Sequence, residues 1–263
     1  GSDDGPVILC LHGLLDQGVV WDGVAQFLVK KGFSVIAPDF RGHGKSQHSS
    51  LESPYQLLDF VTDMDALIRH LDRRIVAMVG HSMGAVVAGL LVAARPMLAE
   101  KLIFVEPPAI RPEQRKDGPQ FFRAYLDYAA TVPVHPVFPD FSAASERLRK
   151  IIPSLTSEES DRLASRITVN VENGVVWTWD ARLRTRSGVL FDSFHSTSDY
   201  VKSLVQSIEI PCVSIFGSNS ELKDQETFFD ESKYMKRKVT VDGGHHPHLD
   251  VPSEVTEIIC GDL

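Results

Sequence analysis

Strand-like segments alternate with helix-like segments along most of this chain, and this order most limits what the chain can fold into. Six segments have the length and composition of short strands: Val7–Leu11, Ser34–Ala37, Ile75–Val79, Leu102–Val105, Cys212–Phe216 and Lys238–Val241. Helix-like segments follow five of them: Trp21–Lys30, Tyr55–Leu71, Ala85–Ala94, the region around Glu226–Lys233, and a last helix from Ser253. This alternation predicts an α/β fold with a mostly parallel sheet and helices on both faces.

The alternation is interrupted between Pro107 and about Val205. This region has prolines, the aromatic sequence Trp177-Thr178-Trp179, and three helix-like segments: Gln120–Ala130, Ser142–Ile152 and Ser157–Ile167. In open α/β sheets ligands bind outside the carboxyl ends of the strands, where an insertion between two parallel strands is well placed to cover them. We therefore expect residues 1–106 and 206–263 to form one core, and residues 107–205 to form a lid insertion.

Composition narrows the class of protein. The 263 residues are enough for one large α/β domain or two small ones. A formal charge of −8 argues against a nucleic-acid surface. No apolar segment approaches the roughly 20 residues of a membrane span, so no membrane partner is expected. Cys10, Cys212 and Cys260 lack metal-ligand spacing, which favours structural cysteines in a reduced, cytoplasmic setting. The start at Gly1-Ser2, without Met, is consistent with a domain excised from a longer protein.

The sequence Gly80-His81-Ser82-Met83-Gly84 follows the third strand-like segment and precedes a helix of small residues. Gly-x-Ser-x-Gly in this context is a nucleophile elbow, and the chain resembles the α/β-hydrolase fold family. The tight turn needs both glycines, and it holds Ser82 in a strained conformation with its hydroxyl exposed at a helix N-terminus. Met83 and Leu14, in the sequence His12-Gly13-Leu14, are expected to supply the main-chain N–H groups of an oxyanion hole.

The catalytic base is expected late in the chain, because the triad order in this fold is serine, acid, histidine. Gly243-Gly244-His245-His246-Pro247-His248 follows the last strand-like segment. In the family pattern, the histidine follows a glycine and precedes x-Pro-x-Leu-acid-x-Pro. His245 fits that pattern through to Pro252. His248 is the alternative base, and His246 is expected to line the substrate site.

The catalytic acid departs from the family pattern. The usual aspartate lies three residues after the glycine that ends the penultimate strand, but Ser220 stands three residues after Gly217. A serine cannot stabilise an imidazolium by charge. Glu106 ends the strand next to the nucleophile strand, from which a carboxylate can reach the same histidine. Glu106 is therefore the expected acid, and Asp224 the alternative; a plain hinge role for Glu106 also stays open.

A closer resemblance is carried by the insertion, which is normally the least shared part of such chains. The segments that carry it are Leu126–Tyr128, His135–Asp140, Arg147–Arg149, Ile152–Leu155, Arg166–Thr168, Gly174–Asp180 and Leu183–Ser187. Over nearly its whole length the chain resembles the terminal offloading thioesterase domains of modular polyketide synthases. The resemblance implies that an acyl carrier protein delivers a small acyl substrate on its phosphopantetheine arm, with no metal or organic cofactor. It also implies Ser82 as nucleophile, Glu106 as acid and His245 as base.

Some of these thioesterases act on a β-sulfated acyl chain and release a terminal alkene after loss of CO2 and sulfate. Arg186 matches the arginine that recognises the sulfate in them, a role that suits the planar guanidinium; a charged lid surface is the alternative reading of this arginine. His246 and Asp192 stand where the decarboxylating pattern has asparagines. The sequence therefore supports thioester hydrolysis more directly than alkene formation. A free-standing carboxylesterase, or a catalytically silent binding module, is the alternative function.

Overall fold

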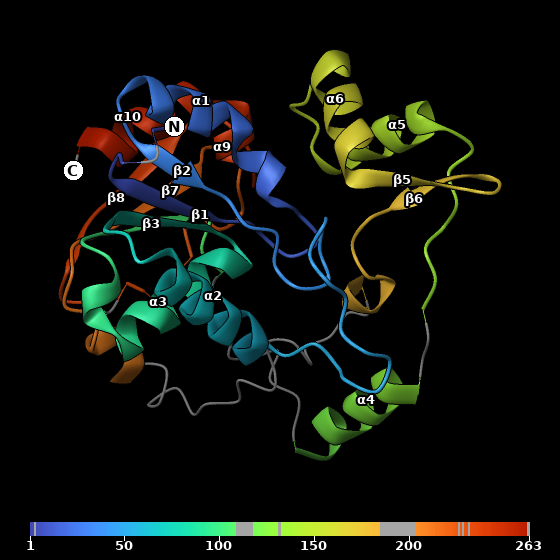
Figure 1. The fold of residues 1–263 in the computed structure, drawn as a ribbon, viewed down its shortest axis with the longest axis horizontal. Helices are drawn as coiled ribbons and strands as arrows, with labels where there is room; N and C mark the ends of the chain where they lie inside the picture. The colour runs from blue at the N-terminus through green and yellow to red at the C-terminus, as the bar shows by residue number, and fades with distance from the viewer. Residues whose placement is uncertain are drawn as a thin grey trace.

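A computed structural model describes residues 1–2, 4–108, 118–130, 133–184, 203–225, 227, 229–230 and 232–261. Six parallel strands form the main sheet in the order β2-β1-β3-β4-β7-β8 (Figure 1). Their bounds are β1 (Val7–Leu11), β2 (Ser34–Ile36), β3 (Ile75–His81), β4 (Leu102–Val105), β7 (Cys212–Gly217) and β8 (Met235–Val241). Every residue of the four inner strands is buried, as expected when helices cover both faces of a parallel sheet. The fold class predicted from the alternation is confirmed.

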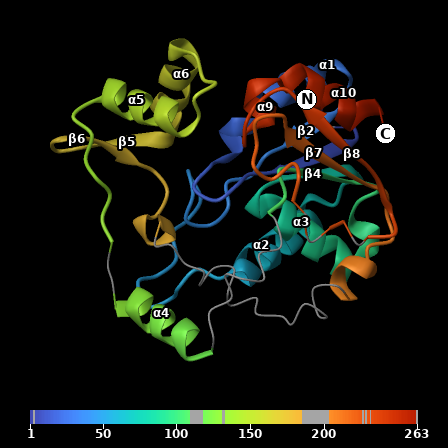
Figure 2. The ribbon, with the colours of Figure 1, turned by 180° about the vertical axis from the view of Figure 1, so that it is seen from behind.

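Helices pack on both faces of this sheet. One face is covered by α1 (Asp22–Lys30), α9 (Pro247–Asp250) and α10 (Pro252–Gly261), and the other by α2 (Leu57–Leu71) and α3 (Met83–Ala94), as Figures 1 and 2 show. Helix α3 lies between the sheet and α2, so most of its residues are buried. Its residues are mainly alanine, valine, leucine and glycine, which suits a helix that is buried on nearly every face. No helix in the described part of the chain is long and apolar enough to cross a bilayer.

The prediction of a helix around Glu226–Lys233 is wrong. The described residues of the range Glu226–Lys233 form turns and an isolated bridge instead. The Thr227 N–H and hydroxyl both donate to the Asp230 carboxylate, at 2.8 and 3.0 Å. Such local side-chain bonds offer the backbone an alternative to helical hydrogen bonds, and they stabilise a turn here.

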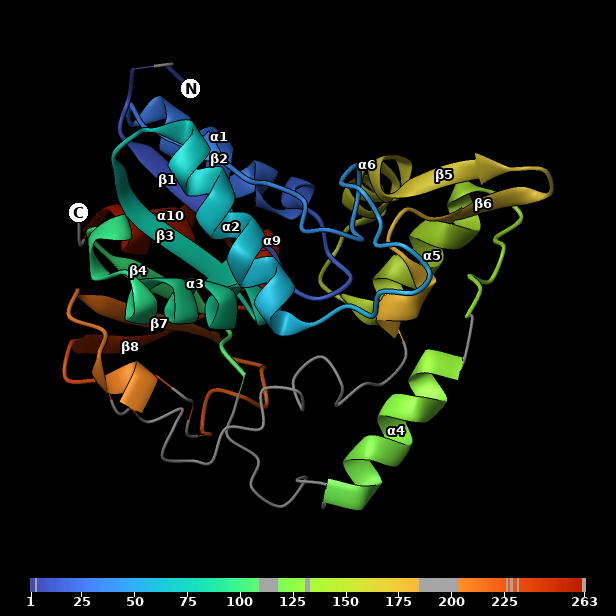
Figure 3. The same cartoon turned by 60° about the horizontal axis from the view of Figure 1, so that its bottom comes forward.

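The described part of the inserted region contains three α-helices, a short 3-10 helix at Ala181–Arg184 and a two-stranded antiparallel sheet. Their bounds are α4 (Gly118–Ala130), α5 (Phe141–Ile151), α6 (Ser157–Ile167), β5 (Thr168–Val171) and β6 (Gly174–Trp177). The hairpin β5-β6 was not expected from the sequence. Figure 3 shows α5, α6 and the hairpin grouped to one side of the main sheet.

Contacts with three core loops fix this region beside the carboxyl ends of the strands. The Asp180 N–H donates to the Gly42 carbonyl at 2.6 Å, in the loop after β2. The side chain of Thr178 accepts a hydrogen bond from Gln17, which follows β1, and Ser154 donates to Asp250, which follows β8. The insertion therefore borders the edge of the sheet at which Ser82 and Glu106 lie.

Candidate active site

Ser82 occupies a strained turn between β3 and α3. Its φ is 48° and its ψ is −114°, which a residue with a side chain rarely adopts. The Ser82 N–H donates to the Val105 carbonyl at 2.9 Å, which ties the turn to β4. A Cβ on Gly80 would clash with the main chain of Gly84, and a Cβ on Gly84 would clash with the main chain of Leu11. Glycine is thus required on both sides of the serine, as the elbow motif predicts.

The two candidate oxyanion donors come from the start of α3 and from the loop after β1. Met83 is the first residue of α3, so its N–H has no partner within the helix. Leu14 follows β1 in the loop that begins at His12. Within the described residues, neither the Met83 N–H nor the Leu14 N–H has a hydrogen-bond acceptor. Both donors are therefore available to a substrate oxygen.

Two buried histidines hold the loop that carries Leu14. The Nε2 atom of His12 accepts the Phe40 N–H at 2.9 Å, while its Nδ1 donates to the Gly13 carbonyl at 2.7 Å. His43 Nε2 accepts the Leu15 N–H at 3.1 Å, and its Nδ1 donates to the main chain at 3.0 Å. Burial lowers the pKa of His12 to about 3 and that of His43 to about 4. Both rings are neutral at pH 7, each with one nitrogen as acceptor and the other as donor, and they position the loop.

Glu106 and His245 meet in the site. His245 Nδ1 lies 3.1 Å from Glu106 Oε2, and the glutamate is fully buried at the end of β4. The Gly217 N–H donates to Oε1 at 2.7 Å, and the Ser220 hydroxyl donates to Oε2 at 2.5 Å. Three donors therefore surround one buried carboxyl group, so its oxygens have hydrogen-bond partners away from water. Ser220 was not expected to take part, yet it binds the acid from the position where the family has its aspartate.

The alternative acid, Asp224, and the alternative base, His248, do not take part in the contact between Glu106 and His245. Asp224 is exposed to solvent. His248 is fully buried and stacks on Trp21 with 4.4 Å between ring centroids. Neither ring nitrogen of His248 has a hydrogen-bond partner among the described residues, and burial lowers its pKa well below the ordinary value. The geometry therefore pairs His245, and not His248, with a carboxylate.

His246 turns toward a second acidic group. Its Nε2 lies 3.5 Å from Asp16 Oδ2, and His81 Nδ1 lies 3.2 Å from the same oxygen. Burial lowers the pKa of His81 to about 4. Burial opposes a charge on His246 as well, but the Asp16 carboxylate outweighs it and raises the pKa of His246. Asp16 and His81 were missed at the sequence level, because no local pattern shows that the loop after β1 meets the loop after β8.

The residues proposed for sulfate recognition, Arg186 and Asp192, lie outside the described residues. Arg182, four positions before Arg186, is buried and is held by the core. It donates to the main-chain carbonyls of Ser49 and Ser50 at 2.6 and 2.8 Å and pairs with the Asp180 carboxylate at 2.7 Å. This arginine is therefore structural.

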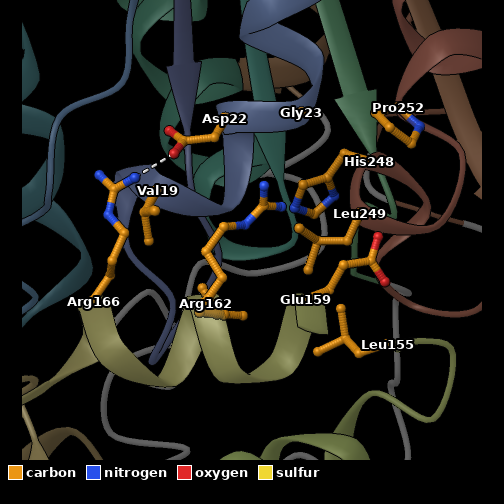
Figure 4. A pocket seen from close by; sticks show the side chains of 11 residues that line it. Val19, Asp22, Gly23, Leu155, Glu159, Arg162, Arg166, His248, Leu249 and Pro252 are labelled. Atoms are coloured by element: carbon orange, nitrogen blue, oxygen red, sulfur yellow. Dashed lines mark hydrogen bonds and ion pairs between the residues drawn. The ribbon is translucent and has the colours of Figure 1, made fainter. Parts of the chain in front are cut away.

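A cavity of about 70 Å³ lies between α6 on one side and the adjacent helices α1 and α9 on the other. The lining residues are Val19, Asp22, Gly23, Leu155, Glu159, Arg162, Leu163, Arg166, His248, Leu249 and Pro252. Figure 4 shows Arg162 extending toward the His248 ring, while Arg166 pairs with Asp22. The His248 ring also lies 4.5 Å from the His81 ring, so the cavity borders the group of histidines behind Ser82.

Known proteins share this architecture over nearly the whole chain. The family model described as alpha/beta hydrolase fold matches residues 6–252. Serine hydrolase-like protein 2 of Homo sapiens is 29% identical over 280 residues, covering 100% of this chain and 88% of the relative. A serine hydrolase-like protein of Danio rerio is 25% identical, covering 98% of this chain and 82% of the relative.

Two solved structures are similar as well. The thioesterase domain from the curacin biosynthetic pathway is 36% identical with a TM-score of 0.88, covering 99% of this chain and 93% of that domain. A hypothetical protein of Pseudomonas aeruginosa is 26% identical with a TM-score of 0.81, covering 98% of this chain and 91% of that protein. The elbow at Ser82, the parallel sheet and these matches agree: the chain belongs to the α/β-hydrolase family and is an enzyme of the serine hydrolase type.

Proposed function

We propose that this enzyme is a thioesterase, with Ser82 as nucleophile, His245 as base and Glu106 as acid. The observation that carries the substrate class is the 36% identity to the curacin thioesterase domain, which extends over 99% of the chain and so includes the insertion. The contact between Glu106 and His245 supports the acid, because the carboxylate comes from the end of β4 and not from the loop after β7. The substrate would be an acyl chain on the phosphopantetheine arm of an acyl carrier protein.

In the proposed acylation step, His245 removes the proton of the Ser82 hydroxyl. The Nδ1 atom of His245 faces the Glu106 carboxylate, which can only accept, so Nδ1 carries the ring proton and Nε2 is left as the base. The serine oxygen attacks the thioester carbonyl, and the Met83 and Leu14 N–H groups hold the resulting oxyanion. The carrier thiol then leaves with the proton from His245, and the acyl chain remains on Ser82 as an ester.

In the proposed second step, water releases the acyl chain. His245 removes a proton from the water, the hydroxide attacks the acyl ester, and the proton returns to the serine oxygen as the acid leaves. Glu106 stabilises the imidazolium in both steps and keeps the ring oriented. Each oxyanion donor is worth roughly 3 kcal/mol of the barrier, so the positions of Leu14 and Met83 matter as much as those of the proton carriers.

Decarboxylation of a β-sulfated chain to an alkene is the finer form of this proposal. Arg186 would bind the sulfate, with His246 and Asp192 as further groups near the substrate. His246 and Asp192 replace asparagines of the decarboxylating pattern, and a carboxylate at position 192 would oppose a sulfate. These two differences favour release of the intact acid.

A free-standing carboxylesterase is the second candidate. The observation that favours it is that this chain covers 88% and 82% of relatives named only as serine hydrolase-like proteins. This candidate uses the same triad and oxyanion hole, but it needs no carrier protein.

Turnover of an acyl-carrier thioester should be compared with turnover of a p-nitrophenyl ester of the same chain, with Ser82→Ala as the control. A higher kcat/KM for the carrier substrate is expected; preference for the free ester would contradict the thioesterase proposal. Mass spectrometry of products from 3-hydroxyacyl and 3-sulfooxyacyl carriers then separates acid from alkene. Intact acid alone from the sulfated substrate would rule out the decarboxylating form.

A further inference from the structure

The Asp16, His81 and His246 side chains meet beside the proposed catalytic groups. They come from the loop after β1, the end of β3 and the loop after β8. One ligand atom from each, a carboxylate oxygen or a ring nitrogen, lies within 4.8 Å of the other two. The three side chains are 16%, 1% and 11% exposed, so they form an inner group and not a solvated acidic surface.

The hydrogen bonds of His81 determine which of its nitrogens can act as a ligand. Its Nε2 lies 2.8 Å from the main-chain oxygen of His245. A carbonyl oxygen can only accept, so this Nε2 carries a proton and donates it. In the neutral ring, Nδ1 is then a bare lone pair, the form in which imidazole binds a metal ion.

This lone pair is not satisfied by the protein. His81 Nδ1 has no partner in hydrogen-bonding geometry among the described residues, although Asp16 Oδ2 is only 3.2 Å away. A nitrogen lone pair and a carboxylate oxygen therefore face each other where water has little access. Buried polar atoms normally have partners, and an unpaired one that faces a group of candidate ligands is a position where a water molecule or an ion can bind.

We propose that Asp16, His81 and His246 bind a divalent transition-metal cation, for which zinc is the best match. Two imidazole nitrogens and one carboxylate oxygen are a donor set that zinc accepts, and a water molecule completes four-coordination. Bonds of about 2.0–2.2 Å at tetrahedral angles separate neighbouring ligand atoms by about 3.3–3.5 Å. Asp16 Oδ2 lies 3.2 Å from His81 Nδ1 and 3.5 Å from His246 Nε2, so two of the three separations already suit a zinc ion.

The position of the proposed site leads us to expect that zinc inhibits the enzyme. A Cβ on Gly13 would lie 2.7 Å from His81 Nδ1 and 2.8 Å from Asp16 Oδ2, so the ion would sit directly against the loop that presents Leu14. The ring of His81 also holds the main chain of His245. An ion bound to His81 therefore touches both the loop that presents Leu14 and the ring that holds the main chain of His245, and we expect turnover to fall when it binds. The inference rests on serine hydrolase chemistry at Ser82 and His245, and not on the identity of the acyl chain.

The first experiment measures binding without catalysis. Isothermal titration of Ser82→Ala protein with zinc is expected to show one ion per chain, and cobalt(II) is expected to give the visible absorption of a tetrahedral site. In the same background, Asp16→Asn and His246→Asn each remove a ligand and should weaken zinc binding by at least about tenfold. His70→Ala is the matched control, because His70 is an exposed histidine on α2, and zinc binding should not change.

The second experiment measures inhibition in the active enzyme. Zinc is expected to slow p-nitrophenyl ester hydrolysis, and a chelator is expected to restore it, in both wild-type and His70→Ala protein. In His246→Asn protein the inhibition should require at least about tenfold more zinc. Circular dichroism and Tm check that the variants are folded. Absence of one-to-one zinc binding, or inhibition unchanged by His246→Asn in folded protein, would overturn the proposal.

Discussion

At the scale of single residues, Glu106 shows that the candidate acid can come from a different strand than in the family pattern and still contact His245. Its two oxygens receive donors from Gly217, Ser220 and His245, which lie at the end of β7, in the segment after β7 and in the segment after β8. Its φ of 51° is as unusual for a residue with a side chain as that of Ser82. A strained main-chain conformation of this kind costs roughly 1–3 kcal/mol, which a residue without a function would not be expected to retain.

Replacing the acid tests this assignment. In Glu106→Gln the ring of His245 keeps a neighbour of the same shape but loses the charge that stabilises its imidazolium form. We expect kcat to fall by about 10³–10⁴-fold, as when a buried triad carboxylate is neutralised. Asp224→Asn is the matched control, because Asp224 is exposed, and it should change kcat by less than about twofold. Steady-state kinetics of both variants decide the question, and the reverse ranking would exclude Glu106 as the acid.

Ser220 allows a complementary test, because its hydroxyl occupies the usual position of the acid. Ser220→Asp alone places two carboxylates together in a buried place, so one is expected to hold a proton and activity should fall. In the double variant with Glu106→Gln, that aspartate is the only carboxylate, and we expect it to restore kcat on the order of tenfold over Glu106→Gln alone. Equal kcat for the double and the single variant would show that position 220 cannot deliver an acid to His245.

Residue patterns could predict the triad candidates because each ends or follows a strand in a recognisable local sequence. Ser82 is identified by its flanking glycines, His245 by the segment that follows it, and Glu106 by an ionisable residue after an apolar strand. The meeting of Asp16 with His81 could not be predicted in this way. Those residues are 65 positions apart, and only the folded sheet brings the loop after β1 to the end of β3.

At the scale of elements, the hairpin β5-β6 is the clearest feature that the sequence indicates but that our sequence analysis did not predict. Asn173-Gly174 lies between Val169-Asn170-Val171 and Val175-Val176-Trp177, a common hairpin signature. Gly174 has a φ of 143°, and a Cβ there would clash with the carbonyl of Phe138. The helix expected at Glu226–Lys233 failed for the opposite reason, since local hydrogen bonds outweighed a weak helical pattern.

Arg182 connects the insertion to the core and should matter for stability. The guanidinium fills a buried position between Asp180 and the carbonyls of Ser49 and Ser50. Arg182→Ala leaves the Asp180 charge without its main partner, so we expect the free energy of unfolding to fall by about 3–5 kcal/mol. Urea unfolding measures the loss. The exposed Arg184, two residues further, is the control, and Arg184→Ala should change this free energy by less than about 0.5 kcal/mol.

At the scale of the whole molecule, strand order assembles the site. Glu106 and His245 are 139 positions apart, but β4, β7 and β8 are consecutive neighbours in the sheet, so the loops at their carboxyl ends are adjacent. Ser82 enters from β3, on the other side of β4. The same arrangement buries four histidines of the described residues, at positions 12, 43, 81 and 248. Folding of the core and assembly of the site are therefore one event, and conditions that protonate these rings should unfold the enzyme.

The pH dependence of stability tests this coupling. Burial lowers the pKa of His43 to about 4 from an ordinary value of 6.5, so below pH 6.5 the unfolded chain binds a proton that the folded chain does not. Stability is present above pH 6.5 and is lost as the pH falls toward 4. His246, whose pKa is raised, contributes stability that is lost as the pH rises above 6.5, and it does not contribute to the decline at low pH, where the ring is protonated in both states. The carboxyl group of Asp180, whose pKa is lowered, adds its own loss only below about its ordinary value of 3.8.

Between pH 6.5 and 4.5 the loss of stability is therefore expected to come from the buried neutral histidines. Burial lowers the pKa of His43 and that of His81 to about 4. Each of these two histidines should therefore lower the free energy of unfolding by about 2 kcal/mol when the pH falls from 7 to 4.5. His43→Asn should lower stability at pH 7 and make the decline with falling pH shallower by about 2 kcal/mol, because one proton-binding difference is removed. His70→Ala, at an exposed position, should leave the slope unchanged. Urea unfolding at half-unit pH steps measures the slopes; an unchanged slope in His43→Asn would mean that folding does not lower the pKa of His43.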